Sequence, residues 1–256
     1  MPTRAGTVVR MAEQTSPPDV PVAPAATVML LRDGHGGLEV FMLRRTSRAV
    51  FAGGMYVFPG GRLDHNDGQG DAAFVVAAIR ECFEEAGVLL ARGHDGTSVR
   101  DGHPVLSRRH DVHDGVATLS DLCATHELAL SIDDLAYVGR WITPKGETAR
   151  RFDTRFFAAP MPAGQSSHHD DSETVASEWI RPAVALQRNA DGEMMLMPPT
   201  LSMLDFLAQH DTSAAAMRAA HQIGDPQTVL PKVRVDAEGK VVGIALPGDD
   251  DYDSLD

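Results

Sequence analysis

The chain has 256 residues and a formal net charge of −13, with 36 acidic against 23 basic side chains, and 43% of its residues are hydrophobic. This composition excludes a wholly disordered chain, and the acidic balance argues against broad binding to nucleic acid or to an anionic membrane surface. The longest apolar run, residues 72–79, is far shorter than the ~20 residues needed to cross a bilayer.

The two cysteines, Cys82 and Cys123, form no metal-binding CxxC pair and a poor disulfide framework for a chain of this length. At the N-terminus, no basic region is followed by an apolar stretch and a cleavage site, so we expect no secretory signal. These features predict a soluble, cytoplasmic protein with reduced thiols.

The first half of the chain predicts a short tail followed by strands. Residues 1–22 are rich in Pro, Thr, Ser and Ala and have no apolar period, which predicts a disordered N-terminal tail. Residues 26–32 and 38–44 are strand-like and are separated by a glycine-rich turn, so they predict a β-hairpin. A third short strand, residues 55–58, leads into Pro59-Gly60-Gly61.

Residues 71–86 form the clearest predicted helix, with Asp71 as the expected N-cap and Gly87 as the residue that ends it. Residues 92–118 are predicted to be irregular and residues 119–130 to be helical. The remaining elements are predicted in the order strand 136–142, strand 152–158, acidic loop 168–173, helix 182–187, helix 200–210 and hairpin 233–246. The mixture is α+β in one domain, residues 23–248, followed by an acidic C-terminal tail, residues 249–256.

Acidic side chains gather on one face of the helix predicted at residues 71–86. At 100° per residue, Glu81, Glu84 and Glu85 share this face with Arg80, while the apolar side chains occupy the opposite face. A solvated surface is the usual explanation for such glutamates. Two features argue against it, because like charges three and four residues apart repel and because the glycine loop just upstream allows close approach of backbone. Clustered carboxylates beside an open loop suit Mg²⁺ or Mn²⁺.

The residues Gly61, Asp67 and Arg80-Glu-Cys-Phe-Glu-Glu-Ala-Gly-Val88 resemble the Nudix box of the Nudix hydrolase superfamily. The second half of the box matches at every specified position. The first half departs twice, because Asp67 stands where the box has Glu and because twelve residues rather than seven separate it from Arg80. These departures concern the role of Asp67 and leave the helix intact.

Further segments resemble one branch of the superfamily, the peroxisomal-type coenzyme A and acyl-coenzyme A diphosphatases. The segments that carry this likeness are Arg45-Thr46, Gly54, Phe58-Pro-Gly-Gly61, Arg140-Trp-Ile-Thr-Pro144, Arg151-Phe-Asp-Thr-Arg-Phe-Phe157, Glu178-Trp179 and Pro247-Gly-Asp249. The resemblance implies a Nudix fold, a mixed β-sheet sandwiched between helices. It also implies a mainly helical insert at about residues 92–133, either a lid or specificity wall or a simple cover for the core.

The resemblance assigns roles to particular residues. Metal ions, Mg²⁺ or Mn²⁺, would be bound by Glu81 and Glu85, with Glu84 and the carbonyl of Gly60 completing the shell. Arg80 would orient these carboxylates. We expect the general base to be Glu173, with Glu178 as second candidate, although an ordinary solvated turn also explains this loop. Substrate-binding residues are expected to be Arg44, Arg45, Arg48, Gly61 and Arg151, with solvent-facing arginines as the alternative.

Three functions stay open. The first is metal-dependent hydrolysis of coenzyme A or acyl-coenzyme A to 3′,5′-ADP and (acyl-)phosphopantetheine. The second is a Nudix pyrophosphatase for ADP-ribose, dinucleotides or nucleoside triphosphates. The third is a catalytically silent module that binds nucleotides. In each case the expected partner is a small nucleoside diphosphate derivative, and the resemblance allows a homodimer.

Overall fold

The computed structural model describes residues 20–47, 52–146, 150–170 and 174–255. Most of the predicted N-terminal tail therefore lies outside the described residues. The predicted hairpin is confirmed, with strands β1 (Val22–Gly34) and β2 (Gly37–Arg45) that are longer than expected. No helix in the described part of the chain is long and apolar enough to span a membrane.

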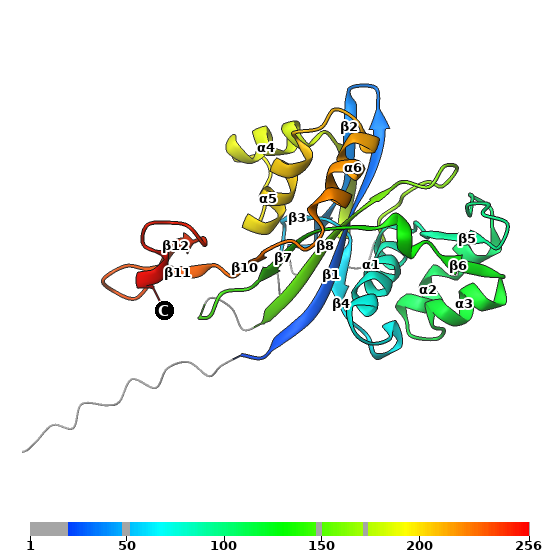
Figure 1. The fold of residues 1–256 in the computed structure, drawn as a ribbon, viewed down its shortest axis with the longest axis horizontal. Helices are drawn as coiled ribbons and strands as arrows, with labels where there is room; N and C mark the ends of the chain where they lie inside the picture. The colour runs from blue at the N-terminus through cyan, green and yellow to red at the C-terminus, as the bar shows by residue number, and fades with distance from the viewer. Residues whose placement is uncertain (1–19, 48–51, 147–149, 171–173, 256) are drawn as a thin grey trace, which may run out of the picture.

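A mixed sheet of eight strands forms the centre of the molecule (Figure 1). Its main path runs β10-β7-β8-β1-β2-β3, and β4 pairs with β1 while β9 pairs with β2. The long central pair β1 and β8 is parallel, whereas β1–β2 and β7–β8 are antiparallel. The further strands are β3 (Tyr56–Val57), β4 (Gly60–Arg62), β7 (Ala136–Ile142), β8 (Arg151–Pro160), β9 (Thr174–Ile180) and β10 (Thr228–Val229).

Alternating side chains of the sheet build a separate core on each face. Val28 and Leu30 of β1 pack into the core beneath helix α1 (Asp71–Ala86), whereas Met29 and Leu31 pack into the opposite core. Three helices cover that second face, α4 (Pro182–Ala190), α5 (Pro198–Leu207) and α6 (Ser213–Ile223). The predicted α+β sandwich of a mixed sheet between helices is confirmed.

Helix α1 has the predicted bounds, but its first turn is arranged differently. Gly70 is the N-cap and makes no side-chain hydrogen bond, so Asp71 is the first helical residue rather than the cap. There Asp71 pairs with Arg155 at 2.8 Å, and its charge is favourable at a helix N-terminus. Gly87 ends the helix as predicted, in the left-handed conformation, and donates its N–H to the carbonyl of Phe83.

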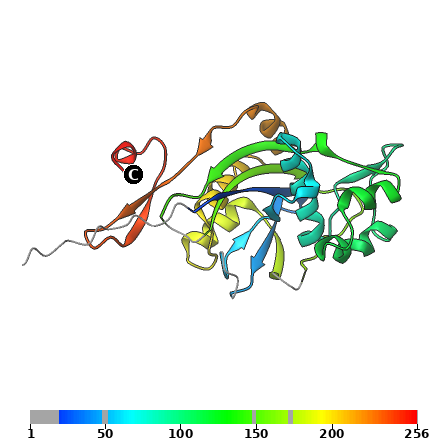
Figure 2. The ribbon, with the colours of Figure 1, turned by 90° about the horizontal axis from the view of Figure 1, so that it is seen from below.

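The predicted insert, residues 92–133, packs beside α1, at the opposite end of the molecule from the C-terminal hairpin (Figures 1 and 2). Its first part is more regular than predicted, and the helix expected at residues 119–130 ends at Thr125. The helix stops there because Glu127 adopts a positive φ of 54° and the next residues pair with the strand after α1. The elements are β5 (Ala91–Gly93), η2 (Pro104–Arg108), α2 (Arg109–His113), α3 (Leu119–Thr125), β6 (Leu128–Leu130) and η3 (Ile132–Asp134).

In the second half of the chain, the strands β7 and β8, the helices α4 and α5, and a late hairpin of β11 (Lys232–Val235) and β12 (Val241–Ala245) agree with the predictions. The sequence interpretation missed β9 and α6. The N-cap Thr212, which accepts from the N–H of Ala215, was an available signal for α6.

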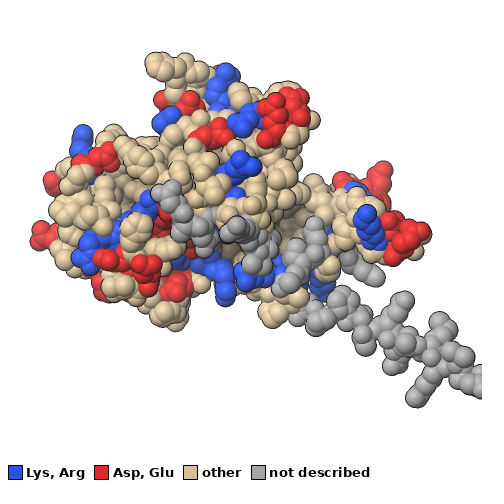
Figure 3. All heavy atoms as spheres, turned by 180° about the vertical axis from the view of Figure 1, so that it is seen from behind, with Lys and Arg blue, Asp and Glu red and all other residues tan. Residues whose placement is uncertain are grey.

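The C-terminal acidic segment is bonded to this late hairpin. Arg234 of β11 pairs with both Asp249 and Asp251, and Lys232 donates to the carbonyl of Leu255. A short turn, η4 (Tyr252–Ser254), lies between these contacts. Figure 3 shows the resulting mixture of acidic and basic side chains on this part of the surface.

Candidate active site

The acidic face of α1 is half-enclosed rather than solvated. Only 12% of the Glu81 side chain and 11% of the Glu84 side chain are exposed, and Glu85 is buried. The opposite face of the helix, with Ile79 and Phe83, is fully buried under the sheet. The sequence therefore predicts the amphipathic helix correctly, and the solvated-surface explanation of its glutamates is wrong.

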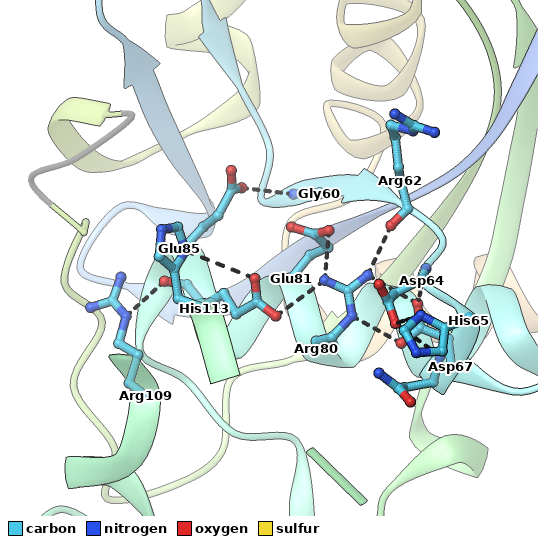
Figure 4. A network of polar contacts seen from close by, with 12 residues as sticks. Gly60, Arg62, Asp64, His65, Asp67, Arg80, Glu81, Glu85, Arg109 and His113 are labelled. Carbon is cyan, nitrogen blue, oxygen red and sulfur yellow. Dashed lines mark hydrogen bonds and ion pairs between the residues drawn. The ribbon is translucent and has the colours of Figure 1, made fainter. Parts of the chain in front are cut away.

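The glycine loop lies against these carboxylates, as Figure 4 shows. The backbone N–H of Gly60 donates to Oε2 of Glu85 at 2.9 Å. A Cβ added at Gly61 would stand 2.4 Å from Oε1 of Glu81, which is closer than non-bonded atoms approach. A side chain at this position would therefore displace the Glu81 carboxylate, because the backbone of β4 runs directly over it.

Arg80 connects the acidic face to the start of the box (Figure 4). It donates to both carboxylate oxygens of Asp67 at 2.9 Å, to Glu81 at 2.8 Å and to Glu84 at 3.1 Å. A further bond at 2.8 Å goes to the carbonyl of Arg62 in β4. Burial acts to lower the pKa of Arg80, but these carboxylates hold it above its ordinary value. The expected orienting role of Arg80 fits this geometry.

The structure gives Asp67 a definite place despite its unusual spacing in the box. Its side chain is buried, pairs with Arg80, and accepts the N–H of Asp64, which caps the short turn η1 (His65–Asp67). The long segment between Asp67 and Arg80 contains the connection of residues 68–70 and the first half of α1. Asp67 therefore contacts Arg80, which lines the cavity, and does not line the cavity itself.

Replacing Asp67 by asparagine should destabilise the protein, because the buried guanidinium of Arg80 then loses a charged partner. We expect the free energy of unfolding to fall by about 1–3 kcal/mol in urea denaturation. Asp64→Asn is the matched control, since that exposed side chain bonds only locally and should cost less than about 1 kcal/mol. Equal losses in the two variants would contradict the role given to Asp67.

Burial raises the pKa of the Glu81 carboxyl to about 7, with Arg80 opposing this effect and the charges of Glu84 and Asp67 adding to it. The folded chain therefore keeps a proton on Glu81 that the unfolded chain releases near the ordinary value of 4.5. The contribution of Glu81 to the free energy of unfolding is therefore greatest below pH 4.5, and it is lost as the pH rises to about 7.

Glu81→Gln mimics the protonated form, so in metal-free buffer with a chelator it should match the wild type near pH 4. At pH 8 it should be more stable by roughly 3 kcal/mol. Urea denaturation at both pH values measures this difference. A difference that does not change with pH would contradict the raised pKa.

The donor set on this face fits a hard divalent cation, because Glu81, Glu84 and Glu85 supply carboxylate oxygens around one cavity. Their orientations differ, since Glu85 faces Gly60 whereas Glu81 and Glu84 face Arg80. In the described part of the chain no three such side chains converge as a metal site. Binding a cation would therefore require these carboxylates to turn toward one another.

The cavity beside these carboxylates has a volume of about 1020 Å³. Its acidic end is formed by α1 and the glycine loop. Its other walls are largely apolar and come from β3, β7, β8 and the start of α5, with Val57, Phe58, Trp141, Phe156 and Met197 among them.

Two of the predicted substrate-binding residues, Arg45 and Gly61, line this cavity. Arg44 is not among the lining residues; it is exposed, and its guanidinium lies 5.8 Å from the ring centre of Tyr56. Arg48 lies outside the described residues, as does the predicted general base Glu173.

Two further candidates are not among the residues that line the cavity. Arg151, a predicted substrate-binding residue, is buried and donates to the carbonyls of Thr143 and Val20. The aromatic face of β8, with Phe152, lines the cavity instead. Glu178, the second candidate base, is held by both of its carboxylate oxygens on Arg188, away from this cavity.

The sequence interpretation missed five charged or histidine residues of the cavity, Arg62, Asp64, His113, Arg150 and Asp170. Arg62 directly follows the glycine loop, so its position was an available signal. His113 belongs to the insert and Asp170 to the acidic loop. Only the tertiary structure brings these last two residues to α1.

A profile of the NUDT19 Nudix domain matches residues 68–207, which is more than half of the chain. The chain belongs to the NUDT19 Nudix domain family. This confirms the resemblance read from the box and places both the box helix and the insert within the matched region.

Relatives of known name agree with this membership. The chain is 31% identical to "Putative nudix hydrolase 7" of Caenorhabditis elegans over 67% of this chain and 56% of that protein. It is 30% identical to "Acyl-coenzyme A diphosphatase NUDT19" of Homo sapiens over 71% of this chain and 51% of that protein. The chain thus spans about half the length of the curated relatives it matches.

Among solved structures, the crystal structure of a Nudix hydrolase from Alicyclobacillus acidocaldarius is similar, with a TM-score of 0.71 and 29% identity. The match covers 78% of this chain and 96% of that one. The Nudix fold of the chain is therefore supported by both sequence and structure.

Proposed function

We propose that this Nudix domain hydrolyses the diphosphate of coenzyme A or an acyl-coenzyme A, giving 3′,5′-ADP and (acyl-)phosphopantetheine. The observation that carries the proposal is the cavity, which joins the carboxylates of α1 to largely apolar walls. A substrate of this class has a charged diphosphate next to a long, less polar arm, and so it matches both ends. The printed name of the human relative, an acyl-coenzyme A diphosphatase, supports the same substrate class.

The reaction is attack of water on one phosphorus of the diphosphate. A P–O bond forms to the water oxygen, the bridging P–O bond breaks, and the water proton passes to a base. Glu173 stays the proposed base. Three residues earlier in the same loop, Asp170 lines the cavity and accepts from the hydroxyl of Thr174 at 2.8 Å.

A bound Mg²⁺ or Mn²⁺ would supply charge neutralisation of the diphosphate and a more acidic water. Glu81, Glu84, Glu85 and the carbonyl of Gly60 are the residues that would hold it. Arg80 keeps two of these carboxylates in place through its fixed fork of donors. Arg45, Arg62 and Arg150 line the cavity and would contact the substrate's phosphates.

Product analysis tests the proposal. The purified protein is incubated with Mg²⁺ or Mn²⁺ and with coenzyme A, acetyl-coenzyme A, ADP-ribose, NADH or nucleoside triphosphates in turn. We expect 3′,5′-ADP from the coenzyme A substrates, and none when a chelator is present. Rapid cleavage of ADP-ribose without turnover of coenzyme A would favour the second function. Binding of nucleotide without turnover under any metal would favour the silent module.

A further inference from the structure

The C-terminal end of α1 is held by residues from two distant segments. The last carbonyls of a helix have no partner within the helix, so other groups must satisfy them. The N–H of Gly87 donates to the carbonyl of Phe83. The N–H of His168, in the acidic loop, donates to the carbonyl of Ala86 at 2.8 Å. The carbonyl of Glu84 accepts a hydrogen bond from Nε of Arg109, a residue of the insert, at 2.7 Å.

Arg109 is the first residue of α2 and joins three segments at this point. Its Nη1 lies 3.2 Å from where a Cβ of Gly87 would stand, and it donates to the carbonyl of His169 at 3.5 Å. A cation at a helix C-terminus is favourable because it faces the negative end of the helix dipole. Arg109 thus connects the insert with the end of α1 and with the acidic loop.

His113 lies four residues after Arg109, so both side chains leave the same face of α2. Its Nδ1 is 3.9 Å from Oε2 of Glu84, while the other carboxylate oxygen of Glu84 accepts from Arg80 (Figure 4). Helix α2 therefore contacts Glu84 twice. Arg109 bonds the backbone carbonyl of Glu84, and His113 lies beside the carboxylate of Glu84.

We infer that Arg109 and His113 are positioning residues, through which the insert sets the orientation of Glu84 toward the proposed metal site. This inference rests on the proposed function, because it takes Glu84 as a metal ligand. It gives the insert a role beyond covering the core. Groups that orient the ligands of a metal commonly change metal affinity by 10–100-fold.

The test measures Mn²⁺ binding to the substrate-free protein by electron paramagnetic resonance, together with the melting temperature. Arg109→Ala should weaken Mn²⁺ binding by roughly 10–100-fold. Arg108→Ala is the matched control, because Arg108 is the preceding residue, is exposed, and pairs only with nearby Asp111. This control should leave Mn²⁺ binding within about twofold of the wild type.

Two further variants separate positioning from general stability. His113→Ala removes a side chain that is one-third exposed, so it should fold normally and still weaken Mn²⁺ binding. His110→Ala, an exposed residue of the same helix, should not weaken it. Arg109→Lys keeps the charge and one donor, so it should recover part of the affinity. In activity assays, raising the Mn²⁺ concentration should restore kcat of Arg109→Ala.

The outcomes are distinguishable from failure of the proposed function. If the wild type binds Mn²⁺ and Arg109→Ala and His113→Ala bind it equally well, the positioning role is overturned while the proposed function stands. A lower melting temperature of Arg109→Ala with unchanged Mn²⁺ affinity would also overturn it, since that result marks a purely structural contact. A wild type that binds no Mn²⁺ would remove the metal role of α1 itself, and the positioning role with it.

Discussion

Glu85→Gln should reduce turnover strongly while leaving the fold in place. The glutamine keeps an oxygen that accepts the N–H of Gly60, so the bond between α1 and the glycine loop survives. It loses the negative charge that a divalent cation would need at this position. We expect kcat/KM to fall by roughly 10³-fold, equivalent to about 4 kcal/mol of transition-state stabilisation. Steady-state kinetics with coenzyme A and Mg²⁺ measure this loss.

Glu238→Gln is the control for Glu85→Gln, because it makes the same change of charge at an exposed turn of the late hairpin. Its kinetics should equal those of the wild type, and both variants should melt within a few degrees of it. Undiminished activity of Glu85→Gln would overturn the assignment of Glu85 as a metal ligand.

Local patterns determine how much of the fold the sequence predicts. Helix α1 could be placed to the residue because a strict apolar face and a terminal Gly87 mark it. Helix α6 follows a usable N-cap signal at Thr212 that the interpretation overlooked. Strand β9 is harder to find, because it is held by pairing with β2, a partner more than a hundred residues away in the chain.

The candidate site follows the same rule. Helical spacing alone puts Glu81, Glu84 and Glu85 on one face, so their common orientation is predictable. The face of β8 that lines the cavity is not predictable from the sequence. Side chains alternate along this strand, so one face is cationic and the other aromatic, and only the packing decides which of them lines the cavity. The structure places Phe152 there and turns Arg155 onto the ring of Phe74, at 3.9 Å from its centre.

The roles of the insert could not be predicted, since they depend on contacts between segments far apart in the chain. Arg109 and His113 have no sequence motif of their own, and single histidines are most often structural or exposed. Asp67 is similar, because its departure from the box could be resolved only by its bonds to Arg80. In each case the missing information is the partner across space.

Gly61→Ala should reduce catalysis strongly with little effect on the fold. Its new Cβ would stand 2.4 Å from Oε1 of Glu81 and 2.6 Å from Cδ, so the carboxylate must move out of the cavity. The atoms that must move are the end of a flexible side chain, whereas the backbone of β4 can keep its pairing with β1. We expect kcat/KM to fall by roughly 10²-fold, since small displacements in an active site have effects of that size.

Two alanine variants provide controls for Gly61→Ala. Gly243→Ala lies in strand β12 with no atom near the new Cβ, so it should leave activity and melting temperature unchanged. Gly60→Ala would place its Cβ 2.6 Å from the carbonyl oxygen of Ala26, which is backbone and cannot move away, so it should lower the melting temperature markedly. Gly61→Ala should therefore resemble Gly243→Ala in stability and yet lose activity, as Glu85→Gln does to a greater extent. A Gly61→Ala protein with wild-type kcat/KM would show that catalysis does not depend on the position of Glu81.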